Sequence, residues 1–219
     1  MNDSRPTVLY EDNHLLALLK PAGVLTMGDD TGDITMVDVA REYLRVKYDK
    51  PGNIFVGVVH RLDRPVSGVL LFARTSKAAA RLSDQFRRGT VRKLYRAVVE
   101  TSTKVLDAKL VDWLSKDRTV NVVSCVPQNA AGAQECILNF RVNSQGNGRA
   151  HLDVEPTTGR SHQIRVQLAS REMPIVGDVK YGSTSHSGGR ISLHAFHLAI
   201  DHPTQKKRIE IVSKIPLDL

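Results

Sequence analysis

The sequence has few of the features that mark membrane, secreted or disulfide-rich proteins. No apolar run approaches the roughly 20 residues that a membrane helix needs. The N-terminus has no basic segment followed by an apolar stretch, so no secretory signal is visible and we expect a cytoplasmic protein without membrane contact. The two cysteines, Cys125 and Cys136, form no CxxC pair and are too few for a disulfide framework. We therefore predict two buried thiols without chemistry.

Motifs for metal binding and for a serine nucleophile are also missing. The chain has eight histidines but no HExxH motif. His194 and His197 are three residues apart in a strand-like run, where their side chains point to opposite faces. No GxSxG motif is present, and Ser67 precedes Gly68 in a turn that favours small residues anyway. The sequence therefore predicts no metal site and no Ser-His-Asp site.

Positive charge is abundant. Lysine and arginine number 31 against 23 acidic residues, a formal net charge of +8. A basic surface attracts polyanions, of which nucleic acid is the most common in a cytosol. Basic residues concentrate in residues 87–96 and again in residues 205–208. We expect phosphate contacts from Arg87, Arg88, Arg92, Lys93 and the Lys206–Arg208 segment, although two solvated surface segments would give the same pattern.

The apolar pattern indicates a chain that alternates strands with a few helices. Neither an internal repeat nor a linker is visible, so we predict a single domain over residues 1–219. Thr35 and Ser76 are expected to cap the first two helices, Gly89 to end the second, and Ser161 to cap a third of about ten residues. The segment 101–149 reads as short strands and polar turns. The other expected strands cover residues 7–10, 14–20, 54–59, 69–73, 93–100, 151–156 and 190–200.

One loop carries an isolated carboxylate among cations. In HRLDRPVSG, residues 60–68, Asp63 stands between Arg61 and Arg64, and the loop joins two predicted core strands. Flanking cations favour the ionised form of a carboxylate, which would suit a nucleophile or a base. A structural aspartate that caps its own turn and pairs with Arg61 or Arg64 fits the spacing as well.

Two further residues complete the candidate site. Tyr95 is placed on the strand at 93–100, and Arg165 on the helix that follows Ser161. A carboxylate, a tyrosine and an arginine fit several reactions, so residue types alone do not select one.

Four motifs in a fixed order resemble the RluA-type family of pseudouridine synthases. After HRLDRPVSG come KLYRAVV and PTTGRSHQIRVQLA, followed by PIVGD with KYG and SLHAFHL. The resemblance runs from about Thr7 to Pro203. It implies an α+β fold, with a mixed, mostly antiparallel bent sheet, flanking helices and a central cleft.

The family isomerises uridine to pseudouridine in RNA, so the resemblance implies an enzyme that modifies a stem-loop of ribosomal or transfer RNA. It implies no cofactor and no metal. The chain is expected to act as a monomer formed by the catalytic domain alone, without the small RNA-binding domain that many relatives carry in front. Val66 and Gln167 replace the threonine and histidine of many relatives, which puts the choice of substrate in doubt.

By resemblance, Asp63 is the essential residue, through attack on the sugar, attack on the base or assisted elimination. Tyr95 lies against the target base and takes part in proton movement, and Arg165 pairs with the aspartate. Arg61 helps hold RNA with the base extruded. Substrate contacts are also expected from His60, Arg64, Arg92, Lys93, Arg160, His162 and Gln163.

Two other functions compete with this one. An inactive RNA-binding or RNA-remodelling module could keep the same fold, but a pure binder has no need for an anion in a basic cleft. A nucleoside or glycoside hydrolase is the third hypothesis, and free uracil among the products would support it.

Overall fold

A computed structural model describes residues 6–28, 32–186 and 188–219 of the chain. The chain divides into two compact units. The first contains the residues up to Arg92 together with Ala195–Lys214, and the second contains Lys93–His194 and Ile215–Leu219. Each unit is described by itself.

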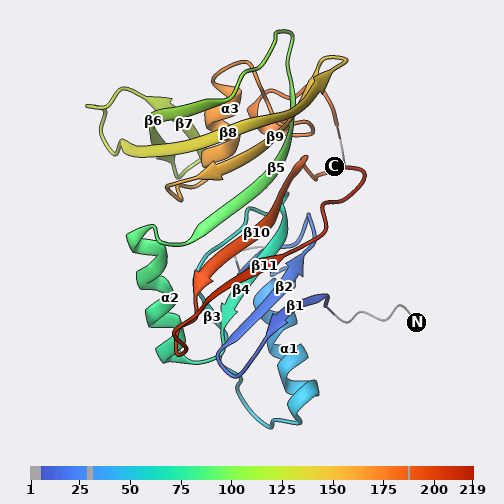
Figure 1. The fold of residues 1–219 in the computed structure, drawn as a ribbon, viewed down its shortest axis with the longest axis vertical. Helices are drawn as coiled ribbons and strands as arrows, with labels where there is room; N and C mark the ends of the chain where they lie inside the picture. The colour runs from blue at the N-terminus through green and yellow to red at the C-terminus, as the bar shows by residue number, and fades with distance from the viewer. Residues whose placement is uncertain (1–5, 29–31, 187) are drawn as a thin grey trace. The chain divides into compact units, whose positions relative to one another are not determined.

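The first unit contains a sheet whose strands come from both ends of the chain (Figure 1). Its strand order is β1-β2-β4-β10, with the short β3 beside β4 and β11 beside β10. The pairs β1–β2, β2–β4, β3–β4 and β10–β11 are antiparallel. The strands are β1 (Val8–Glu11), β2 (Leu15–Lys20), β3 (Gly57–Val58), β4 (Ser67–Ala73), β10 (Leu193–Asp201) and β11 (Arg208–Val212).

Two helices belong to this unit, α1 (Met36–Tyr48) and α2 (Ser76–Arg88). Thr35 caps α1 as predicted, in a capping box with Asp38. The predicted cap of α2 was wrong by one residue, because Thr75 accepts the bond from Ala78 N–H. Gly89 ends α2 in the left-handed conformation at φ +71°, as expected.

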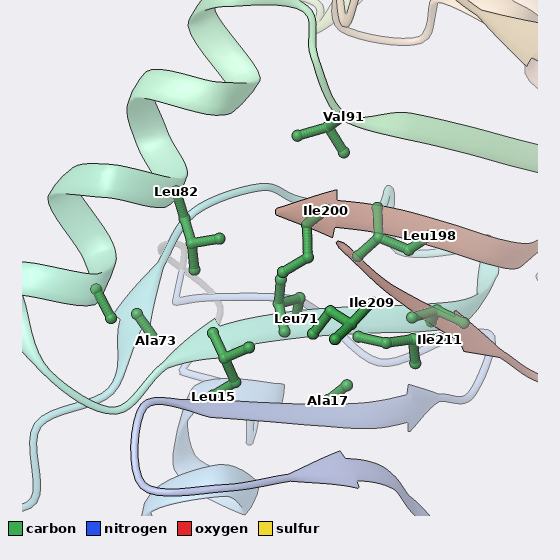
Figure 2. Close-up of a cluster of buried hydrophobic side chains, with 12 residues drawn as sticks. Leu15, Ala17, Leu71, Ala73, Leu82, Val91, Leu198, Ile200, Ile209 and Ile211 are labelled. Atoms are coloured by element: carbon green, nitrogen blue, oxygen red, sulfur yellow. The ribbon is translucent and has the colours of Figure 1, made fainter. Parts of the chain in front are cut away.

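The core of the first unit joins α2 to four strands (Figure 2). Alternate residues of β2 and β4 point into it, since side chains in a strand alternate between the two faces. Leu82 of α2 packs there at 0% exposure. Ile209 and Ile211 come from β11, a strand that the sequence analysis missed although RIEIV alternates polar and apolar residues.

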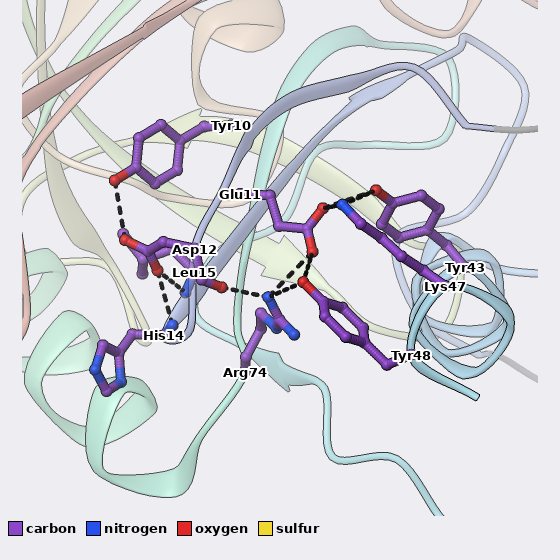
Figure 3. A network of polar contacts seen from close by, with 9 residues as sticks. All are labelled: Tyr10, Glu11, Asp12, His14, Leu15, Tyr43, Lys47, Tyr48 and Arg74. Carbon is purple, nitrogen blue, oxygen red and sulfur yellow. Dashed lines mark hydrogen bonds and ion pairs between the residues drawn. The ribbon is translucent and has the colours of Figure 1, made fainter. Parts of the chain in front are cut away.

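A buried carboxylate ties the end of β1 to α1 (Figure 3). The Glu11 side chain is 8% exposed and accepts bonds from the Tyr43 hydroxyl at 2.7 Å, the Tyr48 hydroxyl at 2.6 Å and the Lys47 ammonium at 2.6 Å. Arg74, just after β4, donates to the same carboxylate at 3.1 Å. These polar contacts fix α1 to the sheet.

The described residues of the second unit form an antiparallel sheet and the α-helix α3 (Figure 1). The strand order is β5-β9-β8-β6-β7, and every neighbouring pair is antiparallel. Helix α3 (Gln163–Ala169) and the 3-10 helix η1 (Val179–Tyr181) follow the last of these strands. The strands are β5 (Arg92–Glu100), β6 (Ala108–Asp117), β7 (Val122–Val126), β8 (Gln134–Gly146) and β9 (Arg149–Pro156).

The predicted α+β class with a mostly antiparallel sheet and flanking helices is confirmed. Four further local predictions were wrong. Only Gly57–Val58 of the segment 54–59 forms a strand, and segment 101–149 folds into three strands of which β8 has 13 residues. Helix α3 begins at Gln163 after His162, without a side-chain cap from Ser161. Cys136 is buried as expected, whereas Cys125 is exposed.

Candidate active site

The loop that carries Asp63 connects β3 to β4 and is anchored on both sides of the carboxylate. The buried hydroxyl of Thr26 donates to the Leu62 carbonyl at 2.9 Å and accepts from the Leu62 N–H at 3.2 Å. On the other side, the N–H of Val66 donates to the Asp63 carbonyl at 3.0 Å, which closes a turn. Leu62 and Val66 are buried at 6% and 3% exposure, whereas Asp63 is half-buried. The turn thus presents the carboxylate from a fixed backbone.

A buried lysine also holds the same loop through hydrogen bonds to backbone carbonyls. Lys20 ends β2 and is 0% exposed. Its ammonium donates to the carbonyl oxygens of Pro21 at 2.9 Å, Val24 at 2.6 Å and Arg64 at 3.1 Å. The Gly23 N–H donates to the same Arg64 carbonyl at 2.8 Å. The KPAG segment, residues 20–23, therefore clamps the residue that follows Asp63.

The environment of Lys20 alters its acidity. Burial lowers the pKa of the Lys20 ammonium to about 8, because the interior disfavours its charge. The negative charge of Asp63 raises that pKa and the positive charge of Arg64 lowers it further. Lys20 therefore lies close enough to Asp63 for their charges to interact.

The arginines on either side of Asp63 are exposed, as a contact with RNA would require. The Arg64 guanidinium donates to the Gly23 carbonyl at 3.0 Å and pairs with Asp33 at 2.8 Å. Arg61 lies at the surface beside the buried Leu62. Both positions are consistent with the predicted substrate contacts.

His60 contributes to the framework of the loop. Its Nε2 accepts a bond from the Leu71 N–H of β4 at 2.9 Å. Its ring stacks on Phe86 of α2, with the ring centroids 5.0 Å apart. A nitrogen that accepts a backbone N–H carries no proton of its own, so His60 holds the loop against β4 and α2 through this atom. His60 therefore has a structural role in addition to the predicted contact with the substrate.

The second unit carries Tyr95, near the middle of β5 and opposite Val154 of β9. Lys93 lies two residues earlier and therefore on the same face of the strand. Its ammonium donates to the Thr158 carbonyl at 3.2 Å, and burial lowers its pKa to about 8. The structure thus joins the KLYRAVV motif to the loop of the TTGR motif. Arg92, at the start of β5, is exposed.

Gln163, predicted to contact the substrate, is 4% exposed and organises the TTGR loop. Its side-chain oxygen accepts from the Thr158 hydroxyl at 2.8 Å and from the Arg160 N–H at 3.0 Å. Its amide nitrogen donates to Gln167 at 3.1 Å, and Gln167 donates to Asp112 at 2.7 Å. The glutamine at position 167 is therefore a buried link in the support of this loop. Arg160 itself is exposed.

Arg165 forms a buried ion pair within the second unit. Its Nε and one terminal nitrogen donate to the two oxygens of Asp178 at 2.7 and 2.8 Å. The guanidinium lies 4.9 Å from the centre of the Tyr181 ring. The Tyr181 hydroxyl accepts from the Val123 N–H at 3.1 Å and lies 2.6 Å from His162 Nδ1. Asp178 and Tyr181, neither of which the sequence analysis selected, therefore fix Arg165 and His162.

The predicted catalytic residues are thus divided between the units. Asp63 lies in the first unit with Arg61, Arg64 and His60, and Tyr95 and Arg165 lie in the second. Buried polar groups hold the backbone on either side of Asp63 in the first unit, and the buried Asp178 holds the Arg165 guanidinium in the second.

The model of the RNA pseudouridylate synthase family matches residues 14–170 of the chain. This stretch contains the HRLD, KLYRAVV and TTGR motifs and runs through both units.

The chain belongs to this family.

The motif-based prediction of the family is confirmed, and with it the prediction that the chain is an RNA pseudouridine synthase.

Several curated members of the family resemble nearly the whole chain. The uncharacterized RNA pseudouridine synthase YhcT of Bacillus subtilis is 31% identical over 97% of this chain and 69% of its own length. Ribosomal large subunit pseudouridine synthase C of Buchnera aphidicola is 33% identical over 96% of this chain and 67% of its own. tRNA pseudouridine synthase C of Pectobacterium carotovorum is 29% identical, covering 94% of this chain and 58% of that protein. The chain therefore spans roughly 58–69% of the length of these relatives.

A solved structure supports the fold. Human RNA pseudouridylate synthase domain containing 4 superposes with a TM-score of 0.79, at 22% identity, over 97% of this chain and 89% of that one. Within residues 6–28, 32–186 and 188–219, no three His, Cys, Asp or Glu side chains are grouped so as to hold a metal ion. No helix in the described part of the chain is long and apolar enough to span a membrane.

Proposed function

We propose that this pseudouridine synthase converts specific uridines in ribosomal or transfer RNA, with Asp63 as the residue on which the reaction depends. In the isomerisation, the bond between ribose C1′ and ring N1 breaks and a bond between C1′ and ring C5 forms. The proton on C5 is lost and N1 gains one, so no atom is added overall. The names of the relatives support RNA of these two classes as the substrate.

The observation that carries this proposal is the double anchoring of the Asp63 turn. Thr26 and Lys20 bond to the backbone of Leu62 and Arg64, the residues on either side of Asp63. A reacting group must be held within a fraction of an ångström of its productive position, and buried supporting bonds provide this. A carboxylate that merely capped its own turn would not need a buried ammonium beneath it.

The remaining residues receive roles that follow from the family pattern. Tyr95 stacks on the target base and its hydroxyl assists proton movement. Arg165, fixed by Asp178, pairs with Asp63 in the active enzyme. Arg61 holds the RNA with the target nucleotide flipped out, because a stacked base hides its glycosidic bond. The family match at residues 14–170 runs through both units, and YhcT resembles 97% of this chain, which together support a single catalytic domain.

Asp63→Asn tests the proposal. RNA from cells that lack this gene is incubated with excess enzyme, and the yield of pseudouridine is measured by site-specific mapping, with RNA affinity measured in parallel. We expect the substitution to abolish pseudouridine formation while RNA affinity holds or rises, since a negative charge near phosphates is lost.

Asp33→Asn is the matched control, because it removes a carboxylate that pairs with Arg64 beside the same loop. This control should retain activity. Equal yields from wild type and Asp63→Asn would remove Asp63 from the mechanism. Free uracil among the wild-type products would instead indicate hydrolysis.

A further inference from the structure

Two basic segments that are more than 100 residues apart in the sequence meet in the first unit. One is the C-terminal half of α2 with the turn into β5, and the other is the turn between β10 and β11, which lies beside α2 in Figure 1. The exposed cations of these two segments, named here the basic surface, are Arg81, Arg87, Arg88, Arg92, Lys206, Lys207 and Arg208.

A buried glutamine joins the two segments. Gln85 of α2 is 6% exposed, and its amide pairs with the backbone of Asp201. The amide nitrogen donates to the Asp201 carbonyl at 2.8 Å, and the amide oxygen accepts from the Asp201 N–H at 2.9 Å. Arg81 donates to the Pro203 carbonyl, and Arg208 donates to the Thr90 carbonyl at 3.3 Å. The hairpin turn is therefore fixed against α2.

The balance of charge on this surface is strongly positive. Asp84 and Asp201 are the carboxylates within the two segments, against the seven cations of the basic surface. Asp84 pairs with Arg88 at 2.7 Å and also with Arg87, and Asp201 pairs with Arg208 at 3.1 Å. A groove between the segments is lined by two arginines, Arg81 and Arg88, and by two aspartates, Asp84 and Asp201. The excess of positive charge therefore comes from the exposed cations around the groove, such as Lys206 and Lys207, and it matches a polyanion.

The basic surface is connected to the loop of Asp63. Phe86 of α2 stacks on His60, the first residue of the HRLD motif, with the ring planes 16° apart. The next two residues of α2 are Arg87 and Arg88. The end of α2 therefore lies next to the first residue of the loop that carries Asp63.

We propose that the basic surface binds the phosphodiester backbone of the RNA substrate next to the target nucleotide. The inference rests on the proposed function and adds to it the surface with which the enzyme contacts the RNA backbone. Exposed lysine and arginine side chains contact phosphates without reading sequence, and such contacts set the register of the RNA. Each contact releases condensed counterions and makes binding depend on salt.

The test compares two triple substitutions in the full chain. Arg88→Gln with Lys206→Gln and Lys207→Gln removes three charges from the basic surface. Arg41→Gln with Arg45→Gln and Lys50→Gln removes three charges from exposed positions on or just after α1 in the same unit. Each set removes three exposed positive charges from the same unit. Arg88 in the first set, and Arg41 and Arg45 in the second, pair with an acidic residue of their own helix.

The probe is a fluorescently labelled single-stranded RNA of mixed sequence without uridine, so binding is measured without any reaction. We expect the basic-surface variant to bind more weakly and to lose about 2 from the slope of log affinity against log salt, at ~0.7 per lost contact. The α1 variant should keep the wild-type slope.

Equal slopes for the two variants would overturn the proposal, and would leave an acidic protein as the partner to consider for this surface. Because the probe contains no uridine and cannot be isomerised, equal slopes would carry no information against the role of Asp63. Conversely, an active Asp63→Asn protein would overturn the proposed mechanism and leave the RNA contact standing.

Discussion

The ammonium of Lys20 lies 3.1 Å from the carbonyl oxygen of Arg64, the residue that follows Asp63. A charged group without solvent exposure is costly, and burial lowers the pKa of Lys20 to about 8. The three carbonyls that accept from this ammonium belong to Pro21 of the KPAG segment, to Val24 just after it, and to Arg64 of the loop 60–68. The buried charge of Lys20 therefore connects the KPAG segment to the loop that carries Asp63.

Stability should therefore depend on the titration of Lys20. Its pKa is about 8 in the folded chain and near 10.5 when unfolded, so between these values the unfolded chain binds more protons. Stability then rises with pH across this interval. We expect the free energy of unfolding of wild type, relative to Lys20→Met, to increase by about 2 kcal/mol between pH 7 and 9.5.

Urea denaturation of both proteins at the two pH values measures this difference. Lys93, whose pKa is also lowered to about 8, is present in both proteins and its contribution cancels. A difference that does not change with pH would show that Lys20 is not a buried charge at pH 7.

The sequence predicted the elements whose signals are local. Thr35 with Asp38, and Gly89, set helix ends through bonds within a few residues. The strand predicted at 93–100, which carries Tyr95, likewise forms as β5. By contrast, the segment 54–59 forms only a two-residue strand, Gly57–Val58, and Phe55 of its apolar run is exposed.

The residues that hold the candidate site in place could not be predicted from local sequence signals. A lysine is normally exposed, so nothing local marks Lys20 as buried under a loop more than 40 residues away. Asp178 and Gln85 likewise act on partners distant in sequence. The motifs predicted which residues react, whereas the fold was needed to show what holds those residues.

Gly68 offers a test of how tightly β4 packs against β10. A Cβ atom at this position would lie 2.2 Å from the backbone oxygen of Ala195, and Gly68 has φ +128°. We expect Gly68→Ala to lose more than about 3 kcal/mol of stability, because the clash adds to the strain of a positive φ. Urea denaturation, or the soluble yield if the variant does not fold, measures the loss.

Gly52→Ala is the control, since Gly52 has φ +89° but no atom within 4 Å of an added Cβ. It should lose only about 1–2 kcal/mol, the cost of the left-handed conformation alone. Equal losses at the two positions would mean that β10 can move away from β4.

The Arg165–Asp178 pair should be far more important for stability than a similar pair nearer the surface. Both Arg165–Asp178 and Arg96–Asp153 have an Nε to carboxylate distance of 2.7 Å. The first pair is 6% and 2% exposed, and the second is 25% and 32% exposed. We expect Asp178→Asn to cost about 3–5 kcal/mol, because it leaves a buried guanidinium without its carboxylate.

Asp153→Asn is the matched control and should cost about 1 kcal/mol or less, as water screens the exposed arginine. Thermal or urea unfolding of the two variants gives the comparison. If Asp178→Asn lowers the free energy of unfolding no more than Asp153→Asn does, burial does not increase the contribution of the Arg165–Asp178 pair to stability.

Lys93 should be the most reactive lysine of the described chain toward amine reagents near pH 8. With its pKa lowered to about 8, about half of its amines are neutral at that pH, against less than about 1% for a lysine near 10.4. Lys93 is also partly exposed. We expect limited treatment with acetic anhydride, followed by mass spectrometry of peptides, to show Lys93 modified ahead of the exposed Lys206 and Lys207.

Lys20 is the control for accessibility, because its pKa is lowered to the same value but its side chain is 0% exposed. It should stay unmodified while the protein is folded. Since Lys93 shares a strand face with Tyr95, bound RNA should slow its modification if both face the substrate. Labelling of Lys93 at an unchanged rate with saturating RNA would argue against its predicted substrate contact. Labelling of Lys20 at the rate of Lys93 would mean that the clamp beneath Asp63 opens readily in solution.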